Sequence, residues 1–159
     1  MDLTHLANLA EIFGGFAIII SLIYVSRQLK QTNLMMRNAA GSERMERDYD
    51  LVLPVIESRE FAEVWIKGGN EFHELSSVDQ QRLLLFERRA IVLWHHTFQL
   101  DKQGLFPQSH WTEQNWVVQN FGKRQAIREA WESFKPAFEP DFIEYIEEQF
   151  AIADGAKSQ

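Results

Sequence analysis

The chain has 159 residues, a formal net charge of −7 and 45% hydrophobic residues, so it is long and apolar enough for one folded domain plus a short additional element. The acidic balance argues against a nucleic-acid partner, because phosphates require a basic protein surface. The sequence contains no cysteine, which excludes disulfides, thiolate catalysis and cysteine-ligated metals.

The first predicted element is an apolar helix. Residues 12–25 carry no charge and would span about 21 Å as a helix. Counting from Leu6 gives about 30 Å, the thickness of a bilayer core. We therefore expect residues 1–40 to form a transmembrane helix with a basic juxtamembrane extension. A long amphipathic helix buried in a soluble oligomer is the alternative, whereas a cleaved signal peptide is disfavoured because no Lys or Arg precedes the apolar run.

Charge on either side of the apolar run predicts its orientation. Arg27, Lys30 and Arg37 follow the run, and Asp2 and Glu11 lie on its other side. Positive residues flank membrane helices on the cytoplasmic side. The sequence therefore predicts an N-terminus outside the membrane and a cytoplasmic C-terminal domain.

Small residues repeat along this helix with heptad spacing. At alternating intervals of three and four the sequence has Ala7, Ala10, Gly14, Ala17, Ser21 and Tyr24, followed by Gln28 and Gln31. Small side chains allow helix backbones to approach closely in lipid. We expect a homo-oligomer that associates through this seam, with another membrane protein as the alternative partner.

Two polar residues fall inside the expected span, Asn8 and Glu11. An acid within a membrane helix is a functional-site hypothesis by default. Glu11 follows Ala10 and so lies at the flank of the seam. A small homo-oligomeric ion channel with Glu11 near the pore is therefore an alternative function, whereas a Glu11 at the outer interface would have no such role.

The N-terminal sequence resembles a recurring bacterial pattern. Residues 11–15 read Glu-Ile-Phe-Gly-Gly, and residues 21–33 read Ser-Leu-Ile-Tyr-Val-Ser-Arg-Gln-Leu-Lys-Gln-Thr-Asn. This pattern is similar to the N-terminal region of a family of small bacterial proteins, which the stretch 61–65 also resembles. The resemblance implies a helical protein of the bacterial inner membrane, and it implies no particular activity.

Residues 41–152 are predicted to form an acidic cytoplasmic domain of helices. Ser58 is a candidate helix cap, and Ser77 with Gln80 forms a capping-box pattern. The first helix is expected to continue toward Arg47, with a possible kink at Gly41 and a break at Pro54. Four further helices are predicted from the Ser58 cap to Lys67, over about 78–102, from a Ser109 cap to about Phe121, and over about 141–151. Gly122 separates the third of these from another helix that runs through Trp131 to Phe134. The expected fold is therefore all-α, with one long N-terminal helix followed by an aromatic-rich bundle of about five helices and a frayed tail, 153–159.

Aromatic residues at helical spacing predict the core of this bundle. The expected core residues are Phe61, Trp65, Phe86, Trp94, Phe98, Trp116, Trp131, Phe134, Phe142 and Phe150.

The sequence carries no recognisable catalytic or cofactor motif. His95 and His96 are neighbours, which point about 100° apart on a helix and are poorly placed to chelate one ion. His73 and His110 have no partner at ligand spacing. We expect no cofactor and no metal, and a scaffold or partner-binding role; an enzyme or metal protein in the helical domain is a further alternative.

Overall fold

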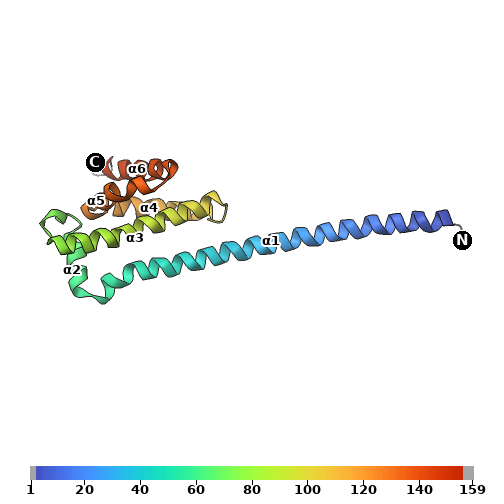
Figure 1. Ribbon diagram of the computed structural model, residues 1–159, viewed down its shortest axis with the longest axis horizontal. Helices are drawn as coiled ribbons and strands as arrows, with labels where there is room; N and C mark the ends of the chain where they lie inside the picture. The colour runs from blue at the N-terminus through green and yellow to red at the C-terminus, as the bar shows by residue number, and fades with distance from the viewer. Residues whose placement is uncertain (1–2, 156–159) are drawn as a thin grey trace. The chain divides into compact units, whose positions relative to one another are not determined.

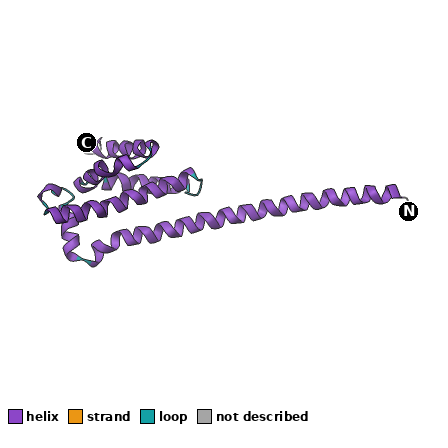
Figure 2. Ribbon diagram, in the orientation of Figure 1, coloured by secondary structure: helices purple, strands orange, loops and turns teal. Residues whose placement is uncertain are grey.

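A computed structural model describes the backbone of residues 3–155 and the side chains of residue 11 and residues 13–155. Residues 3–155 form helices joined by short loops and contain no strand (Figure 2). The α-helices are α1 (Leu3–Glu57), α2 (Arg59–Lys67), α3 (Ser77–Lys102), α4 (Trp111–Phe121), α5 (Gln125–Phe134) and α6 (Pro140–Gly155). The predicted fold class is therefore confirmed: a long N-terminal helix precedes a bundle of five helices.

The chain divides into two units, Met1–Ala39 and Ala40–Gln159. The first unit holds the N-terminal part of α1. The second unit holds the remainder of α1 and the helices α2 to α6, and we refer to it as the helical domain.

Helix α1 continues through Pro54, so the break expected there is wrong, and Gly41, where we expected a kink, also lies within the helix. Proline has no N–H, so the carbonyl four residues earlier loses its helical partner. That carbonyl belongs to Asp50, and the Arg89 guanidinium of α3 donates to it at 3.0 Å. The buried Leu51 adds apolar packing on the same stretch of helix. A tertiary hydrogen bond thus replaces the one that Pro54 removes, and the helix ends at Glu57.

Helix starts in the domain follow local capping, with one shift from the expectation. The Ser58 hydroxyl accepts from the Phe61 amide at 3.1 Å, which confirms the predicted cap of α2. Helix α3 is capped by Ser76, which accepts from the Asp79 amide, and Ser77 is its first residue. Gln80 instead donates to the Leu75 carbonyl.

Helices α4 and α6 differ at one end from the prediction. Helix α4 begins after a 3-10 turn, Gln108–His110, rather than at a Ser109 cap. Helix α6 continues through Gly155 because Ala153, which we placed in a frayed tail, is 1% exposed and packs inside the domain. Residues 156–159 of that predicted tail lie outside the described residues.

Helix α3 lies at the centre of the helical domain (Figure 1). Helices α4, α5 and α6 cover one side of it, and the domain part of α1 follows its other side. The apolar core gathers where α3 meets α5 and α6, around Trp94, Trp131 and Phe142.

The aromatic core prediction is largely confirmed. The buried members are Phe61, Phe86, Trp94, Trp131, Phe142 and Phe150, and the partly buried members packed against them are Trp65, Phe98 and Phe134. The prediction is wrong for Trp116, whose surface is 63% exposed. On α4 it is Val118, fully buried, that faces the core instead.

Candidate functional site

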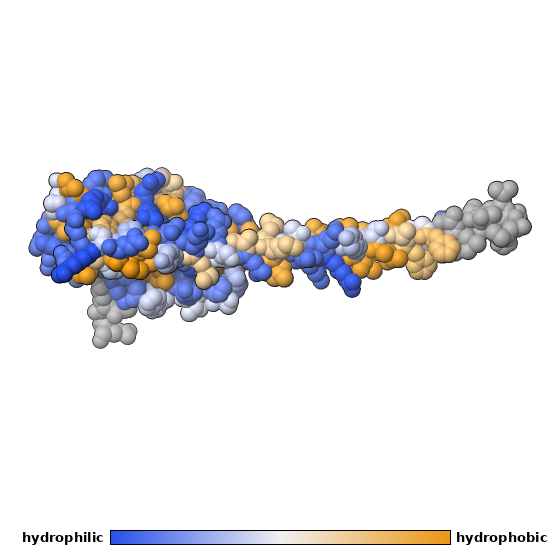
Figure 3. Space-filling model, turned by 90° about the horizontal axis from the view of Figure 1, so that it is seen from below, coloured by the Kyte–Doolittle hydropathy of each residue, from blue (hydrophilic) through white to orange (hydrophobic). Residues whose placement is uncertain are grey.

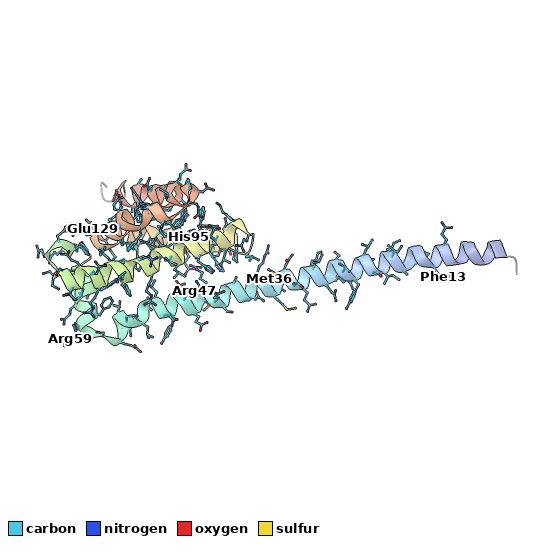
Figure 4. All side chains as sticks on the ribbon, viewed as in Figure 1. Phe13, Met36, Arg47, Arg59, His95 and Glu129 are labelled. Atoms are coloured by element: carbon cyan, nitrogen blue, oxygen red, sulfur yellow. The ribbon has the colours of Figure 1, made fainter. Side chains whose placement is uncertain are left out.

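The N-terminal unit exposes a run of large apolar side chains between residues 13 and 25, which is followed by the exposed Arg27 and Lys30. Large side chains along it are exposed, with accessible fractions of 69% for Phe13 and 66% for Ile20. Figure 3 shows apolar patches on this part of α1, and in Figure 4 the labelled Phe13 projects from the helix. Among the described residues, α1 is the one helix that is long and apolar enough to cross a membrane, and no part of its apolar window is buried.

The seam residues whose side chains are described all lie exposed on α1: Gly14, Ala17, Ser21 and Tyr24. Residues three and four apart share one face of a helix, so these four form a strip. A Cβ added to Gly14 meets nothing within 4 Å, so a neighbouring helix has room to approach. The side chains of Ala7, Asn8 and Ala10 lie outside the described residues. Glu11 is exposed beside the strip.

A groove of about 370 Å³ runs between the domain part of α1 and α3. It is lined by Arg47, Asp50, Leu51, Leu85, Arg88, Arg89, Val92 and Leu93. Leu51 and Leu93 are buried, whereas Leu85 and Val92 remain 51% and 40% exposed. The groove therefore combines apolar surface with three guanidinium groups, although the domain as a whole is acidic.

The guanidinium groups in this groove differ in their partners. Arg47 pairs with Glu43 on its own helix. Arg88 lies over the Phe134 ring at 5.2 Å, and Arg89 donates to the Asp50 carbonyl. The last two therefore contact a ring and a carbonyl rather than a carboxylate in the described part of the chain, and the Asp50 side chain adds one carboxylate to the lining of the groove. This arrangement suits a ligand that is acidic and partly apolar.

A buried ion pair links three helices of the domain. Glu87 on α3 is fully buried, and its Oε1 accepts from the Arg124 guanidinium at 3.3 Å. Arg124, just before α5, also donates to the Trp65 carbonyl of α2 at 2.6 Å. Its guanidinium stacks on the Trp65 ring at 3.7 Å. The pair therefore fixes the ends of α2 and α5 against the middle of α3.

The buried pair has a protonation equilibrium near neutral pH. Burial raises the pKa of Glu87 to about 7, and the nearby Arg124 opposes that rise. Burial also lowers the pKa of Arg124, while Glu87 counteracts it. The Glu87 Oε2 atom has no hydrogen-bond partner among the described residues. Because Glu87 is shielded from solvent, the pair is placed to govern stability rather than to meet a substrate.

His95 belongs to a polar cluster that joins α3 to the start of α6. Its Nε2 lies 2.8 Å from a Glu139 carboxylate oxygen, and Gln99 donates to the other oxygen of the same carboxylate. The His95 ring packs on Phe138 and Phe142. Figure 4 places His95 on the stretch of α3 beside α6. The cluster holds two helices together, and none of its three side chains lines the groove between α1 and α3.

The remaining histidines are dispersed over the domain. His73 lies 3.2 Å from a Glu129 carboxylate, and His110 packs near the Phe106 ring. Burial lowers the pKa of His96. The described part of the chain brings no three His, Cys, Asp or Glu side chains together as a metal site.

Two features were missed by sequence reasoning although the pattern contained a signal for each. Glu87 follows Leu83 by four residues, so helical spacing already placed it on the buried face of α3. Heptad spacing also continues beyond Gln31 into the domain, where it selects exposed apolar residues of α1. The partner of Glu87, 37 residues away, had no local signal.

Comparison with known proteins found no match to the chain among family models, curated proteins or solved structures. The class of protein is therefore defined by the structure itself: a helical domain attached to a long exposed apolar helix.

Proposed function

We propose that this chain is a single-pass membrane protein of the bacterial inner membrane that self-associates and acts as a scaffold or partner-binding subunit. The observation that carries the proposal is the apolar window of α1, none of which is covered by the rest of the chain. Exposed apolar surface of this length is unfavourable in water and favourable in a bilayer core.

The charge distribution supports the proposed orientation. Arg27, Lys30 and Arg37 follow the apolar run and are all exposed on α1. Such residues favour the cytoplasmic side of a membrane. The helical domain would then face the cytoplasm, which agrees with the resemblance of the N-terminal sequence to small bacterial membrane proteins.

The proposed anchor predicts firm membrane attachment. When membranes that contain the protein are washed with alkaline carbonate, we expect the full chain to remain in the pellet and to be released by detergent. Phe16→Lys combined with Ile18→Lys should release most of the chain, because a charged group at the centre of a span costs about 3 kcal/mol. Ile56→Lys, which lies in the domain, is the matched control and should stay in the pellet. Release of the unaltered chain by carbonate alone would contradict the anchor.

The exposed strip of small residues supports self-association in the membrane. Packing rather than the hydrophobic effect drives helix association in lipid, so small side chains mark the face where backbones approach. Gly14 and Ala17 occupy this strip, whereas Ile19 lies on the opposite face of the helix.

Native mass spectrometry of the full chain in detergent tests the seam. The unaltered chain should give one defined oligomer. Gly14→Leu or Ala17→Leu should lower its subunit number, because a leucine side chain separates the helix backbones. Ile19→Leu is the matched control and should leave the oligomer unchanged. Identical behaviour of all three variants, or a monomeric unaltered chain, would contradict self-association through this seam.

A further inference from the structure

The domain part of α1 exposes a second row of residues that the domain does not cover. Met45, Tyr49, Val52 and Ile56 are 74%, 61%, 42% and 70% exposed, respectively. Their spacing of four, three and four places them on one face of the helix. We refer to these four residues as the outer stripe.

A different face of the same helical segment packs on the domain. Ala40 and Leu51 are buried, Val55 packs against the core, and Arg44 donates to Gln114 of α4 at 3.1 Å. Arg44, Leu51 and Val55 each precede a residue of the outer stripe by one position, about 100° around the helix. The stripe is therefore not the edge of the domain core, but a separate apolar face.

The outer stripe continues the heptad spacing of the N-terminal seam. Between Gln31 and Met45 the same alternation of three and four selects Met35, Asn38 and Ser42. The spacing thus runs without a break from Ala7 to Ile56, entirely within α1. Gln28, Gln31, Asn38 and Ser42 are polar, so the seam and the outer stripe are two separate segments that share one heptad register. Small or apolar residues in one heptad register mark the face along which a helix packs against another helix.

From this we propose that the outer stripe packs against the same stripe of a second copy of this chain, as a parallel coiled coil of two α1 helices. The inference rests on the proposed membrane anchor and seam. A membrane anchor orients every copy in the same direction. The same residue in two neighbouring copies therefore lies at the same distance from the membrane, so the outer stripe of one copy can face the outer stripe of the other. The shared heptad register of the seam and the outer stripe is expected when both faces pack on the same neighbouring helix, and a different partner would not require it.

The residues that flank the outer stripe agree with a parallel pair. With Tyr49 and Ile56 at heptad position a and Met45 and Val52 at position d, a residue at position g of one helix faces the residue at position e, five places further along the sequence, on the other helix. This places Gly41 opposite Glu46, and Asp48 opposite Leu53. No like charges oppose each other, so the flanks permit close approach. Pro54 lies on the face of α1 away from the stripe, where its ring does not interfere.

Disulfide crosslinking of the full chain in membranes tests this pairing, because the sequence contains no cysteine of its own. Tyr49→Cys and Val52→Cys place a thiol at the stripe, and Asp50→Cys is the matched control on another exposed face. Ser21→Cys reports on the seam within the proposed span. A disulfide needs Cβ atoms about 4 Å apart, which a parallel pair offers at the stripe positions alone.

The expected result under mild oxidation is at least fivefold more covalent dimer for Tyr49→Cys and Val52→Cys than for Asp50→Cys. Dimer from Ser21→Cys without an excess at Tyr49 and Val52 would overturn the outer stripe and leave the proposed membrane seam intact. No excess at any of these positions would overturn both. Dimer at Tyr49 and Val52 without dimer at Ser21 would support the stripe and contradict the seam. Equal dimer at Asp50 would overturn the stripe.

Discussion

Arg124→Met is expected to lower the free energy of unfolding of the helical domain by about 3 kcal/mol at pH 7, because it leaves the buried Glu87 carboxyl without a partner. Glu87 is fully buried, and its other oxygen has no partner among the described residues. Methionine retains most of the length of the arginine chain, so the loss reports mainly on charge and hydrogen bonding. Urea unfolding of the detergent-solubilised chain, followed by circular dichroism, measures it.

Two further variants distinguish the loss of stability caused by breaking the buried ion pair from the loss caused by removing any arginine. Arg59→Met removes one partner of the Arg59–Glu63 pair, whose side chains are 94% and 67% exposed, and should cost no more than about 0.5 kcal/mol. Glu87→Met combined with Arg124→Met should recover much of the stability, because two apolar side chains need no charge partner. A double variant as unstable as Arg124→Met alone would contradict this account.

The same pair predicts a pH dependence of stability. The pKa of Glu87 is raised from 4.5 to about 7 in the folded domain. Between these values the folded state binds the proton more tightly than the unfolded chain, so the free energy of unfolding falls as the pH rises from 4.5 to 7. Glu87→Gln should remove this part of the slope. Arg124→Met should extend the decline above pH 7, because loss of the guanidinium raises the carboxyl pKa further.

Trp131→Ala is expected to cost about 4 kcal/mol, the usual range for removing a large aromatic side chain from a core. Trp131 is 2% exposed, and the rings of Phe138, Phe142 and Phe150 lie around it at 5.9, 6.0 and 6.2 Å between centroids. The deletion leaves a cavity at the junction of α5 and α6 that those rings cannot fill. The midpoint of thermal unfolding by circular dichroism measures the loss.

Matched aromatic variants make this test specific. Trp131→Phe should cost clearly less than Trp131→Ala, because the indole Nε1 has no hydrogen-bond partner among the described residues. Trp116→Ala should change stability by no more than about 0.5 kcal/mol, since Trp116 is 63% exposed. A Trp116 variant as unstable as the Trp131 variant would contradict the division between core and surface.

Several parts of the fold follow from the sequence because their causes are local. The Ser58 hydroxyl reaches an amide three residues away, so the start of α2 can be recognised without knowing the rest of the chain. The apolar stretch from Leu6 to Val25 similarly defines an element about 30 Å long, enough for a bilayer core, by composition and length alone. Aromatic spacing located most of the core for the same reason.

The candidate site was predictable to a smaller extent. The sequence selected the seam from Ala7 to Tyr24, and this seam remains a prediction for an assembly of several chains. The groove between α1 and α3 was not predicted, because its arginines come from helices about 40 residues apart. The outer stripe had a sequence signal in its spacing. That Met45 and Tyr49 are uncovered depends on which face of α1 the domain occupies.

The sequence by itself determined an all-α chain, its apolar first helix, most of its helix boundaries and the aromatic character of its core. Only the tertiary structure decided that α1 passes through Pro54, because the replacement donor is Arg89 on another helix. It also decided that Trp116 is exposed while Glu87 is buried against Arg124. Helical spacing and capping act within a few residues, whereas burial depends on which helices meet.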